Sequence, residues 1–546
     1  MSNVEPGAQQ AAAPGAAPAP APAPPLIRSV SCIAASVLLW TTQGFGMNLV
    51  AANVYQIQGS LGASLNETMW LLAAYTAPNA SLAILLVKIR NQFGLRRFAE
   101  ISIAVFAAVA LLHLFVRDLP SAVAVRFVAG IAASPISSLG FLYMLDAFPA
   151  ARKMTWGLSL ALTCSAASPS IARLISPPLI DIGLWHGLYM LEIGLALLSL
   201  AVVYLLPLTP VPRTKVLHWL DFVSYPLIGI SFGLLAVVLS LGRFYWWFEA
   251  PWLGVCLAGS IIAFALAAAI EINRESPLIN LRWLMTPEIL HFAIVLLVFR
   301  IVLSEQTSGA IGLFQNIGLL NEQSQTLYLV ILAATILGGL TSAALLNIER
   351  VSVLHAVALA CITVGAFMDA HSTNLTRPAN MYMSQGLIAY GGGLFLPPAM
   401  MAGFTKTLKQ GPTYITSFIM LFLATQSLGG LIGSAAFGTF VTLREKFHSN
   451  QLVENITLAS PIIADRVHQL GAAHGRVLTD PILRNAEGSA LLAQQATREA
   501  YILAYNDAFL LISVIAGLAL AGLVITVIWS RLRLLLLPAA KAAEAS

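Results

Sequence analysis

Fourteen long apolar runs constrain this chain more than any other feature of its sequence. Each has the roughly 20 residues that an α-helix needs to cross the hydrocarbon core of a bilayer. A window of about 19 residues places them at 31–55, 67–88, 98–116, 121–145, 155–178, 187–206, 222–241, 252–271, 289–316, 324–346, 352–370, 379–402, 413–441 and 499–530. Only 10% of the 546 residues are charged, against about 25% in an ordinary soluble domain. The sequence therefore predicts an all-α polytopic membrane protein.

Lysine and arginine are unevenly distributed between the loops that join these runs. With the N-terminus in the cytoplasm, seventeen of them face the cytoplasm, and the short outer loops hold only Arg117, Arg243 and Arg377. Cytoplasmic loops carry the excess of positive charge in membrane proteins, whereas long segments such as 442–498 translocate largely regardless of charge. We therefore expect an even number of crossings and both termini in the cytoplasm. The net charge of +5 indicates topology, not nucleic-acid binding.

Two parts of the chain resemble each other, which indicates a duplicated unit. The stretch that begins at Arg126 in the fourth run is matched in place by the Gly-rich stretch that begins at Gln385 in the twelfth, and the fifth and thirteenth runs share small residues. Duplicated halves of this kind enclose a site near the bilayer midplane in transporters. We predict two six-helix bundles with two inserted helices between them. The expected division is a disordered Ala/Pro-rich cytoplasmic tail at 1–27, an N-terminal bundle at 28–206, the inserted helices at 207–288, a C-terminal bundle at 289–534 with the extracytoplasmic loop 442–498, and a cytoplasmic tail at 535–546.

Several short stretches, each weak alone, occur in an order and spacing that carry a family resemblance. They are QGSLGASLNETMWLLAAYT (58–76), NQFGLRRF (91–98), RFVAG (126–130), LHWLDF (217–222), WWFEAPW (246–252), SPLINLRWL (276–284) and LREKFHSNQLVENI (443–456). Over almost everything after the Pro-rich tail, the chain resembles the EmrB/QacA-type drug:proton antiporters of the major facilitator superfamily. The resemblance implies the major facilitator fold and proton-coupled efflux of lipophilic or amphipathic small molecules, with no cofactor.

The loop after the second run departs from the family pattern. Gly94, Arg96 and Arg97 fit the family's gating loop between helices two and three, but its leading glycine and aspartate fall on Val87 and Asn91. A tight turn rimmed by cations suits docking on helix C-termini, whose carbonyl groups favour positive charge. The resemblance thus implies a gate with one carboxylate missing, and the alternative is a simple positive-inside anchor.

The fifth run keeps the small residues and the proline of the family's antiporter motif but adds an arginine. Pro169 locally breaks the backbone ladder, and the small residues around it let helices approach closely. Arg173 falls where the family has a glycine, and a bulky cation cannot serve close packing. Arg173 therefore either faces the cavity or extends its charge to the outer surface. In the first run, the family's aspartate falls on Gly46, so this chain lacks that proton site.

Charged side chains inside the apolar runs are functional candidates, because each costs about 2.5–3.5 kcal/mol to insert. They are Arg126, Arg173, Glu192, Arg300 and Glu305. The resemblance implies that Arg126, the helix-four arginine of the family's motif, acts in proton transfer or holds the substrate cavity, whereas Glu192 is a weaker candidate. Four residues at the ends of runs are interpreted as solvated or capping groups: His113, Asp146, Glu271 and Asp369.

Arg300 and Glu305 interrupt the ninth run in the stretch FRIVLSEQTSG. If the helix begins near Pro287, they lie roughly 20 and 27 Å along it, and their separation of five residues turns them about 140° apart. They are too far apart for the usual i to i+4 pair, so each needs a partner on another helix or a wet cavity. We predict proton coupling by Glu305, Arg300 and Arg126. The alternative is a permanent buried salt bridge that orients helices.

The remaining predictions concern ligands and partners. The residues expected to line a lipophilic substrate cavity are Asn48, Trp70, Tyr75, Phe314, Gln315, Tyr390 and Gln426. The four cysteines lack metal-ligand spacing and are expected in the core. The EmrB-type resemblance implies that the loop 442–498 meets a periplasmic adaptor protein that passes substrate to an outer-membrane channel. The alternative is an extracytoplasmic helical hairpin without a partner.

Other functions are less well supported by the sequence. A dedicated transporter of one metabolite would share every feature above and stays the main alternative. A polytopic membrane enzyme needs clustered Asp, Glu, His or Ser residues at a membrane face, and the loops show none. A nontransporting sensor would carry a soluble signalling domain, and the sequence shows none.

Overall fold

The structure is a computed structural model that describes residues 24–210, 213, 215–274, 277–411, 414–454, 456–457 and 459–543. Most of the predicted N-terminal tail and the last three residues therefore lie outside the described residues. The described part is built from helices and contains no strand. The elements of its first half are α1 (Leu26–Ala52), α2 (Val54–Leu61), α3 (Leu65–Thr68), α4 (Trp70–Phe93), α5 (Leu95–Leu112), η1 (His113–Phe115), α6 (Leu119–Asp146), α7 (Ala150–Arg152), η2 (Lys153–Gly157) and α8 (Leu158–Leu205).

The rest of the chain continues with the same kind of element. The two inserted helices are α9 (Asp221–Leu241) and α10 (Pro251–Ile272). They are followed by α11 (Leu281–Leu284), α12 (Pro287–Val302), η3 (Glu305–Gly309), α13 (Ala310–Asn316), η4 (Glu322–Ser324), α14 (Gln325–Leu345), η5 (Ile348–Arg350), α15 (Val351–Asp369), η6 (Pro378–Met381), α16 (Tyr382–Gln410), α17 (Ile415–Glu454), α18 (Pro461–Ala472) and α19 (Pro481–Ala543).

The number of membrane-spanning helices agrees with the sequence prediction. Thirteen described helical segments are long and apolar enough to cross a membrane, and the pair Leu65–Leu82 and Leu86–Phe93, bent by 52°, makes a fourteenth. The segment that contains α8 supplies two of the thirteen, Ala150–Asp181 and His186–Leu205. The predicted all-α architecture of about fourteen spans is therefore confirmed.

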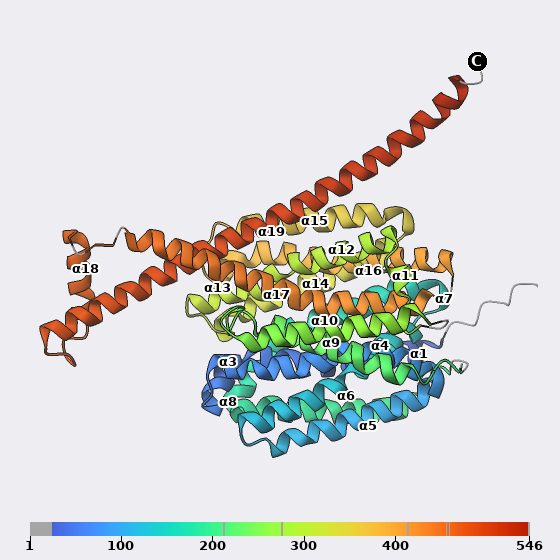
Figure 1. Cartoon of the computed structure of the whole chain (residues 1–546), viewed down its shortest axis with the longest axis horizontal. Helices are drawn as coiled ribbons and strands as arrows, with labels where there is room; N and C mark the ends of the chain where they lie inside the picture. The colour runs from blue at the N-terminus through green and yellow to red at the C-terminus, as the bar shows by residue number, and fades with distance from the viewer. Residues whose placement is uncertain are drawn as a thin grey trace, which may run out of the picture.

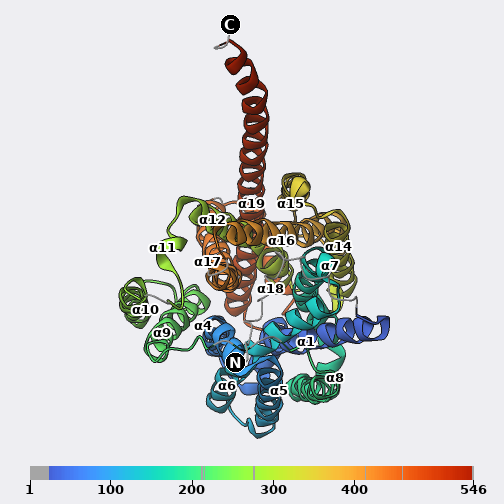
Figure 2. The same cartoon turned by 90° about the vertical axis from the view of Figure 1, so that its right-hand side faces the viewer.

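The helices form two bundles, with α9 and α10 beside them. In the first, α1 packs on α6 and α8, and α4 packs on α6; in the second, α16 packs on α14 and α15, and α19 packs on α15 and α17. The bundles meet where α8 contacts α14 and where α4 contacts α17. The helices approach closely there, because Gly339 of α14 lies against Thr163 of α8 with no room for a side chain. Small residues allow such close approach at membrane helix interfaces. Figure 2 shows α9 and α10 outside both bundles, next to α4.

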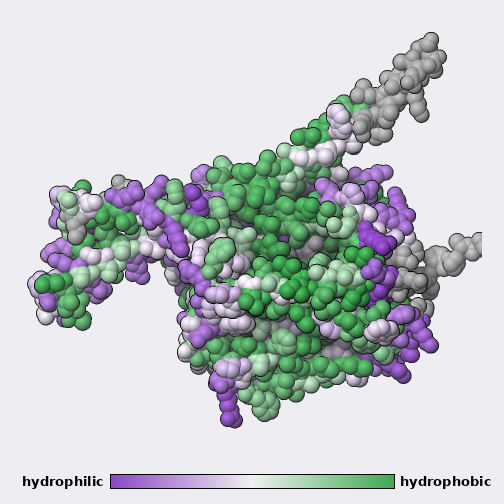
Figure 3. All heavy atoms as spheres, in the orientation of Figure 1, coloured by the Kyte–Doolittle hydropathy of each residue, from purple (hydrophilic) through white to green (hydrophobic). Residues whose placement is uncertain are grey.

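Two ends of the helical body are used below as landmarks. The termini face holds the start of α1 and the ends of α6 and α16, and the α18 face holds the end of α1 and the start of α14 (Figure 1). Apolar side chains cover the body between the two faces, and polar side chains gather at both ends (Figure 3). Leu198, Val255 and Phe367 are among the exposed apolar residues of this belt. Such a belt fits the hydrocarbon core of a bilayer.

A helical projection leaves the body at the α18 face. It consists of the end of α17, the short helix α18 and the start of α19 (Figure 1). The stretches 443–455 and 488–505, whose sequences suit helices, lie mostly within α17 and α19. The structure adds α18, which packs on α19 at two glycines: Gly471 meets the backbone of Arg484, and Gly488 meets the backbone of Val467. The projection is thus a packed helical unit and not a simple hairpin.

Candidate functional site

A cluster of buried polar side chains joins three helical segments of the second bundle. Glu305 opens the π-helical turn η3, Asp369 ends α15, and Gln385 lies in the first turn of α16. Their exposed fractions are 0%, 3% and 0%. Gln385 Nε2 donates hydrogen bonds to Glu305 Oε1 at 2.9 Å and to Asp369 Oδ2 at 2.7 Å. One amide group therefore holds two carboxylates together, and we call these three residues the acidic cluster.

The two carboxylates of the acidic cluster have unequal hydrogen bonding. The Ser384 hydroxyl donates to Asp369 Oδ1, so both oxygens of Asp369 accept a hydrogen bond. Glu305 Oε2 is buried and has no hydrogen-bond partner. Among the described residues, neither carboxylate forms an ion pair. Because a buried carboxylate without a cation is costly, the cluster is suited to bind a small positive charge.

The backbone that carries Glu305 departs from regular α-helix. The π-helical turn η3 contains the polar stretch after Glu305, and π-turns inside helices occur frequently at functional sites. Gly309 ends the turn. A side-chain carbon added at Gly309 would lie 2.7 Å from both Phe437 and Phe509. Gln306 Nε2 donates to the backbone carbonyl of Gln385 at 3.1 Å. The turn is thereby fixed against α16 on one side and against α17 and α19 on the other.

Arg300 lies on a different face of the same span. Its side chain packs on the glycines of α17: a side-chain carbon added at Gly429 would lie 3.1 Å from the Arg300 side chain. The Nε of Arg300 has no hydrogen-bond partner. In the described part of the chain, no ion pair includes Arg300. The structure therefore does not bring Arg300 and Glu305 together, and it shows neither of them in the permanent salt bridge that was the alternative.

Arg126 lies in a second buried cluster, in the first bundle. Its side chain is 0% exposed, its guanidinium carbon lies 4.3 Å from the centre of the Tyr75 ring, and its three side-chain nitrogens have no hydrogen-bond partner. An arginine over a tyrosine face gains about 2 kcal/mol or more when both are removed from water. Glu192 is also buried nearby, and the His113 ring stacks on Tyr189 at 4.4 Å. We call Arg126, Tyr75 and Glu192 the arginine cluster.

Gly46 borders the arginine cluster from α1. A side-chain carbon at this position would lie 2.8 Å from the Tyr75 hydroxyl and 3.0 Å from Glu192 Oε1. Glu192, from the second span of α8, therefore occupies the space into which a side chain at position 46 would point. A carboxylate is thus present beside the α1 position where the resemblance places an aspartate, but it comes from another helix.

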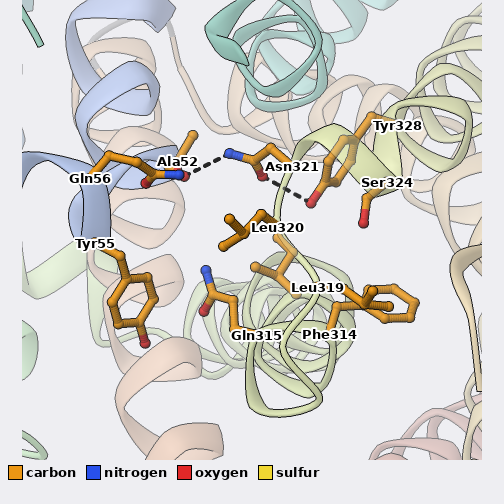
Figure 4. Close-up of a pocket in the computed structure, with 11 residues that line it drawn as sticks. Ala52, Tyr55, Gln56, Phe314, Gln315, Leu319, Leu320, Asn321, Ser324 and Tyr328 are labelled. Atoms are coloured by element: carbon orange, nitrogen blue, oxygen red, sulfur yellow. Dashed lines mark hydrogen bonds between the residues drawn. The ribbon is translucent and has the colours of Figure 1, made fainter. Parts of the chain in front are cut away.

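Arg173 joins the two bundles near the α18 face. Its Nη1 donates to Asn321 Oδ1 at 3.1 Å, and its guanidinium lies 5.5 Å from the Tyr328 ring centre. Asn321 Nδ2 in turn donates to the carbonyl of Ala52 at 2.9 Å and to Asn53 Oδ1 at 3.3 Å. Arg173 is half-buried, and both of its contacts, Asn321 and Tyr328, line the hollow shown in Figure 4, so the two roles considered for Arg173 stay predictions. The structure shows a bond from the first bundle to the second, which we call the Asn321 latch.

The loop between α4 and α5 lies at the termini face. Gly94 has a φ of 87° and packs against Arg213. A side-chain carbon added at Gly94 would lie 2.8 Å from Arg213 Nε. Only glycine adopts such a backbone conformation without strain. Arg96 pairs with Glu100 at 2.8 Å, and Arg97 is exposed. The turn and its cations are therefore present as predicted, and whether they gate stays a prediction.

A charged network next to this loop attaches the inserted helices to α4. Lys88 Nζ and Arg274 Nη2 both lie 2.9 Å from Asp221 Oδ1, and Arg274 Nη1 lies 2.9 Å from Glu271 Oε1. Asp221 begins α9, and Glu271 is in the last turn of α10. All four are largely buried, with side-chain exposures of at most 10%. Broken buried pairs of this kind cost about 3–5 kcal/mol, so the network holds α9 and α10 in place.

Two of the residues expected to line one substrate cavity line a hollow, and the role of the other five stays a prediction. Phe314 and Gln315 line a hollow of about 300 Å³, open solvent included, together with Tyr55 and Asn321 (Figure 4). The other five predicted residues lie elsewhere: Asn48 bonds within its own helix, Trp70 stacks on Trp252 of α10, Tyr75 supports Arg126, Tyr390 packs against the core of the second bundle, and Gln426 Nε2 is buried without a partner.

The interpretation of residues at helix ends needs correction. His113, Glu271 and Asp369 were expected to be solvated or capping, but their exposed fractions are only 2%, 3% and 3%. Glu271 does accept a backbone N–H, from Leu278, so part of its capping role is present. Asp146 agrees with the expectation, because it accepts from the backbone of Thr209 and pairs with Arg28 at 3.2 Å near the termini face. Position in the sequence placed these groups near water, but neighbouring helices cover three of them.

The sequence argument missed Asp369, Gln385 and Asn321 as site residues. A signal for Gln385 was available, because the internal repeat aligns it with Arg126. Asp369 and Glu305 are separated by more than sixty residues, so only tertiary structure shows that they meet. The four cysteines have no disulfide partner, and Cys32 alone is fully buried, whereas Cys164, Cys256 and Cys361 are half-buried. Within the described residues, no group of three or more His, Cys, Asp or Glu side chains is arranged to hold a metal ion.

Two helical bundles with charged side chains buried between and within them define a membrane transporter. The sequence pattern of the Major Facilitator Superfamily matches residues 35–434. The chain belongs to this superfamily of transporters, and the prediction of a transporter rather than an enzyme is confirmed.

Sequence and structure comparisons agree on this assignment. The chain is 22% identical over 488 residues to the multidrug export protein EmrB of Haemophilus influenzae, covering 87% of this chain and 90% of that protein. It is 21% identical over 470 residues to EmrB of Escherichia coli, covering 83% and 86%. The crystal structure of the human organic anion transporter MFSD10 superposes with a TM-score of 0.54 and 11% identity, covering 90% of this chain and 100% of that one. The predicted resemblance to EmrB-type proteins is confirmed, and the structural likeness supports the fold.

Proposed function

We propose that this protein is a proton-coupled exporter of lipophilic or amphipathic small molecules in the cell inner membrane. The observation that carries the proposal is the burial of Glu305 in a membrane span, with one oxygen unpartnered and, among the described residues, no cationic side chain paired with it. A carboxylate in that position costs several kcal/mol as an anion, and a proton removes the charge. Binding and release of that proton supply a step that a pH gradient can drive. The EmrB relatives are multidrug export proteins by name, which supports export of several drugs.

The orientation in the membrane is part of the proposal. The termini face carries Arg90, Arg96, Arg97 and Arg152 at its helix ends. Because positive loops stay in the cytoplasm, we place the termini face in the cytoplasm and the α18 face outside. The Asn321 latch then closes the outer side, so the conformation described is closed to the outside.

The central test measures transport by the full chain in proteoliposomes. Ethidium serves as a lipophilic cationic probe, and a pH gradient is imposed with and without an ionophore that collapses it. Ethidium movement should depend on the gradient and should be lost in Glu305→Gln, while the exposed control Glu322→Gln retains it. Undiminished gradient-driven transport by Glu305→Gln would remove Glu305 from the mechanism. If unrelated lipophilic cations fail to compete with one another, the alternative of a dedicated single-metabolite transporter replaces multidrug export.

An external partner is proposed for the projection. Ile462 of α18, Val477 and Ile482 are exposed by 79%, 83% and 77% in a region outside the apolar belt. Exposed apolar side chains on such a surface suit contact with another protein, and the EmrB resemblance suggests a periplasmic adaptor. A variant that lacks residues 455–490 should lose an adaptor that the full chain recovers in a pull-down from the native host. Equal recovery by both would contradict adaptor docking and favour a projection without a partner.

A further inference from the structure

We propose that Glu305 and Asp369 form a single acid pair that binds one proton between them, with Asp369 facing the outer entrance and Glu305 as the carrier. The inference rests on the proposed proton coupling and adds a second carboxyl, a stoichiometry and a direction to it. Gln385 is the positioning residue, because its one amide nitrogen bonds to both carboxyl groups.

The first argument is geometric. Two carboxylate oxygens that accept from the same nitrogen, at 2.9 and 2.7 Å, are neighbours around that nitrogen. Like charges at such a distance in a buried site raise the free energy of the doubly ionised pair, so the pair holds one proton more tightly than an isolated carboxylate does. The pair therefore carries a net charge of −1 when one proton is bound and −2 when it is lost.

The second argument concerns the surroundings of the pair. Ser384 and Gln385 of α16 both donate hydrogen bonds to Asp369 of the pair. Gln306, the residue after Glu305, donates to the backbone carbonyl of Gln385. From α19, Phe509 packs behind Gly309, and Asn506 bonds to Ser372 just after Asp369. The charged groups of the neighbouring elements are engaged elsewhere: Arg300 packs on α17, and Asp507 pairs with Arg444 and His448. Within the described chain, no cation is thus bonded to either carboxylate.

The third argument assigns the two roles. Asp369 accepts hydrogen bonds on both oxygens, whereas Glu305 accepts on one only. Hydrogen bonds stabilise the charged form of a carboxylate, so Asp369 keeps the charge and Glu305 Oε2 takes the proton. Asp369 is the last residue of α15, near the α18 face, and Glu305 lies within its own span. A proton from the outer side therefore meets Asp369 first and moves to Glu305.

The proposal is tested by infrared difference spectroscopy of the purified full chain during a pH titration. The carbonyl stretch of a protonated carboxylic acid reports the buried proton without any substrate. Wild type should show one buried acid that titrates, and Glu305→Gln should lose it. In Asp369→Asn, the remaining acid should titrate at a pH lower by about one unit or more, because the neighbouring negative charge is gone. The exposed control Glu322→Gln should match wild type.

The outcomes separate this proposal from the proposed function. An acid band in Asp369→Asn that titrates as in wild type overturns the pair, even if transport is driven by protons. Two independent buried acids, or a band that responds to sodium instead of pH, overturn it as well. If the band behaves as expected but ethidium transport ignores the pH gradient, the pair stands and the proposed proton-driven export fails. Thermal unfolding of the same Asp369→Asn sample checks that α15 and α16 still pack together.

Discussion

The arginine cluster in the first bundle and the acidic cluster in the second have opposite electrostatic character. The predicted repeat pairs Arg126 with Gln385. In the first bundle this position supplies a permanent cation above Tyr75, with the Glu192 carboxylate nearby. In the second it supplies a neutral amide between two carboxylates. Under the proposed proton coupling, this one position sets whether a bundle carries a permanent buried cation or two carboxylates that a proton can neutralise.

The strongest way to break this comparison is to make the second bundle resemble the first. Gln385→Arg would place a fixed cation between Glu305 and Asp369 and keep both ionised, because an adjacent arginine favours the charged form. We expect gradient-driven ethidium transport in proteoliposomes to fall by about a hundredfold or more, on the scale of a buried ion pair worth 3–5 kcal/mol. Gln385→Met is the matched control, since it removes the hydrogen bonds without adding charge. If the arginine variant transports better than the methionine variant, the difference between the bundles is not electrostatic.

The reverse change tests the first bundle. Arg126→Gln removes the cation above Tyr75, in the cluster that also contains the buried Glu192 carboxylate. We expect transport to fall by at least about tenfold, with the folded protein retained, because a buried intramembrane charge of this kind is usually functional. Arg126→Lys should recover part of the activity, although lysine lacks the planar group that stacks on the tyrosine. Wild-type transport in Arg126→Gln would show that the two clusters are not equivalent in importance.

The outer connection between the bundles gives a smaller and different effect. Asn321→Ala removes the acceptor for Arg173 and the donor to Ala52. Each lost hydrogen bond costs about 0.5–1.5 kcal/mol, so the closed outer side should open more often without loss of fold. A cysteine introduced at Tyr328 should then react several-fold faster with a membrane-impermeant thiol reagent, relative to the same cysteine with Asn321 intact. Unchanged reactivity would mean that the Asn321 latch does not hold the outer side closed.

The smallest effect is expected at the edge of the arginine cluster. Gly46→Ala adds one carbon against the Tyr75 hydroxyl and Glu192 Oε1, at 2.8 and 3.0 Å. Overpacking of this kind costs about 1–3 kcal/mol, so thermal unfolding in detergent should begin a few degrees lower while transport changes little. Gly254→Ala is the control, because nothing lies within 4 Å of a side-chain carbon there. A Gly46→Ala protein as stable as the Gly254→Ala protein would show that the cluster has room for a helix-one side chain.

The sequence predicted the fold better than the site, for physical reasons. Apolar length identifies each span independently of its neighbours, which is why the spans and the two-bundle plan could be derived. A span surrounded by lipid and protein has apolar residues on all sides, so its pattern does not tell which face meets another helix. Trp70 illustrates this limit: its type suited a substrate cavity, but it stacks on Trp252 of an inserted helix.

Buried charges were identified by their cost, but their partners were not. Glu305 stood out because it interrupts an apolar run, and the same reasoning identified Arg126 and Arg300. Asp369 did not stand out, because a carboxylate at the end of a run needs no special explanation until the neighbouring helix is known to cover it. Gln385 is neutral and raised no electrostatic question. Pairing between distant segments was therefore the part of the site that required the structure.

The length of α19 has a mechanical consequence. This helix runs without interruption through 63 residues, about 95 Å at 1.5 Å per residue, from the projection to beyond the termini face (Figure 1). Near its middle, Phe509 presses on Gly309 at the end of the turn that begins with Glu305. One continuous helix thus connects the projection physically to the backbone turn that carries the buried glutamate.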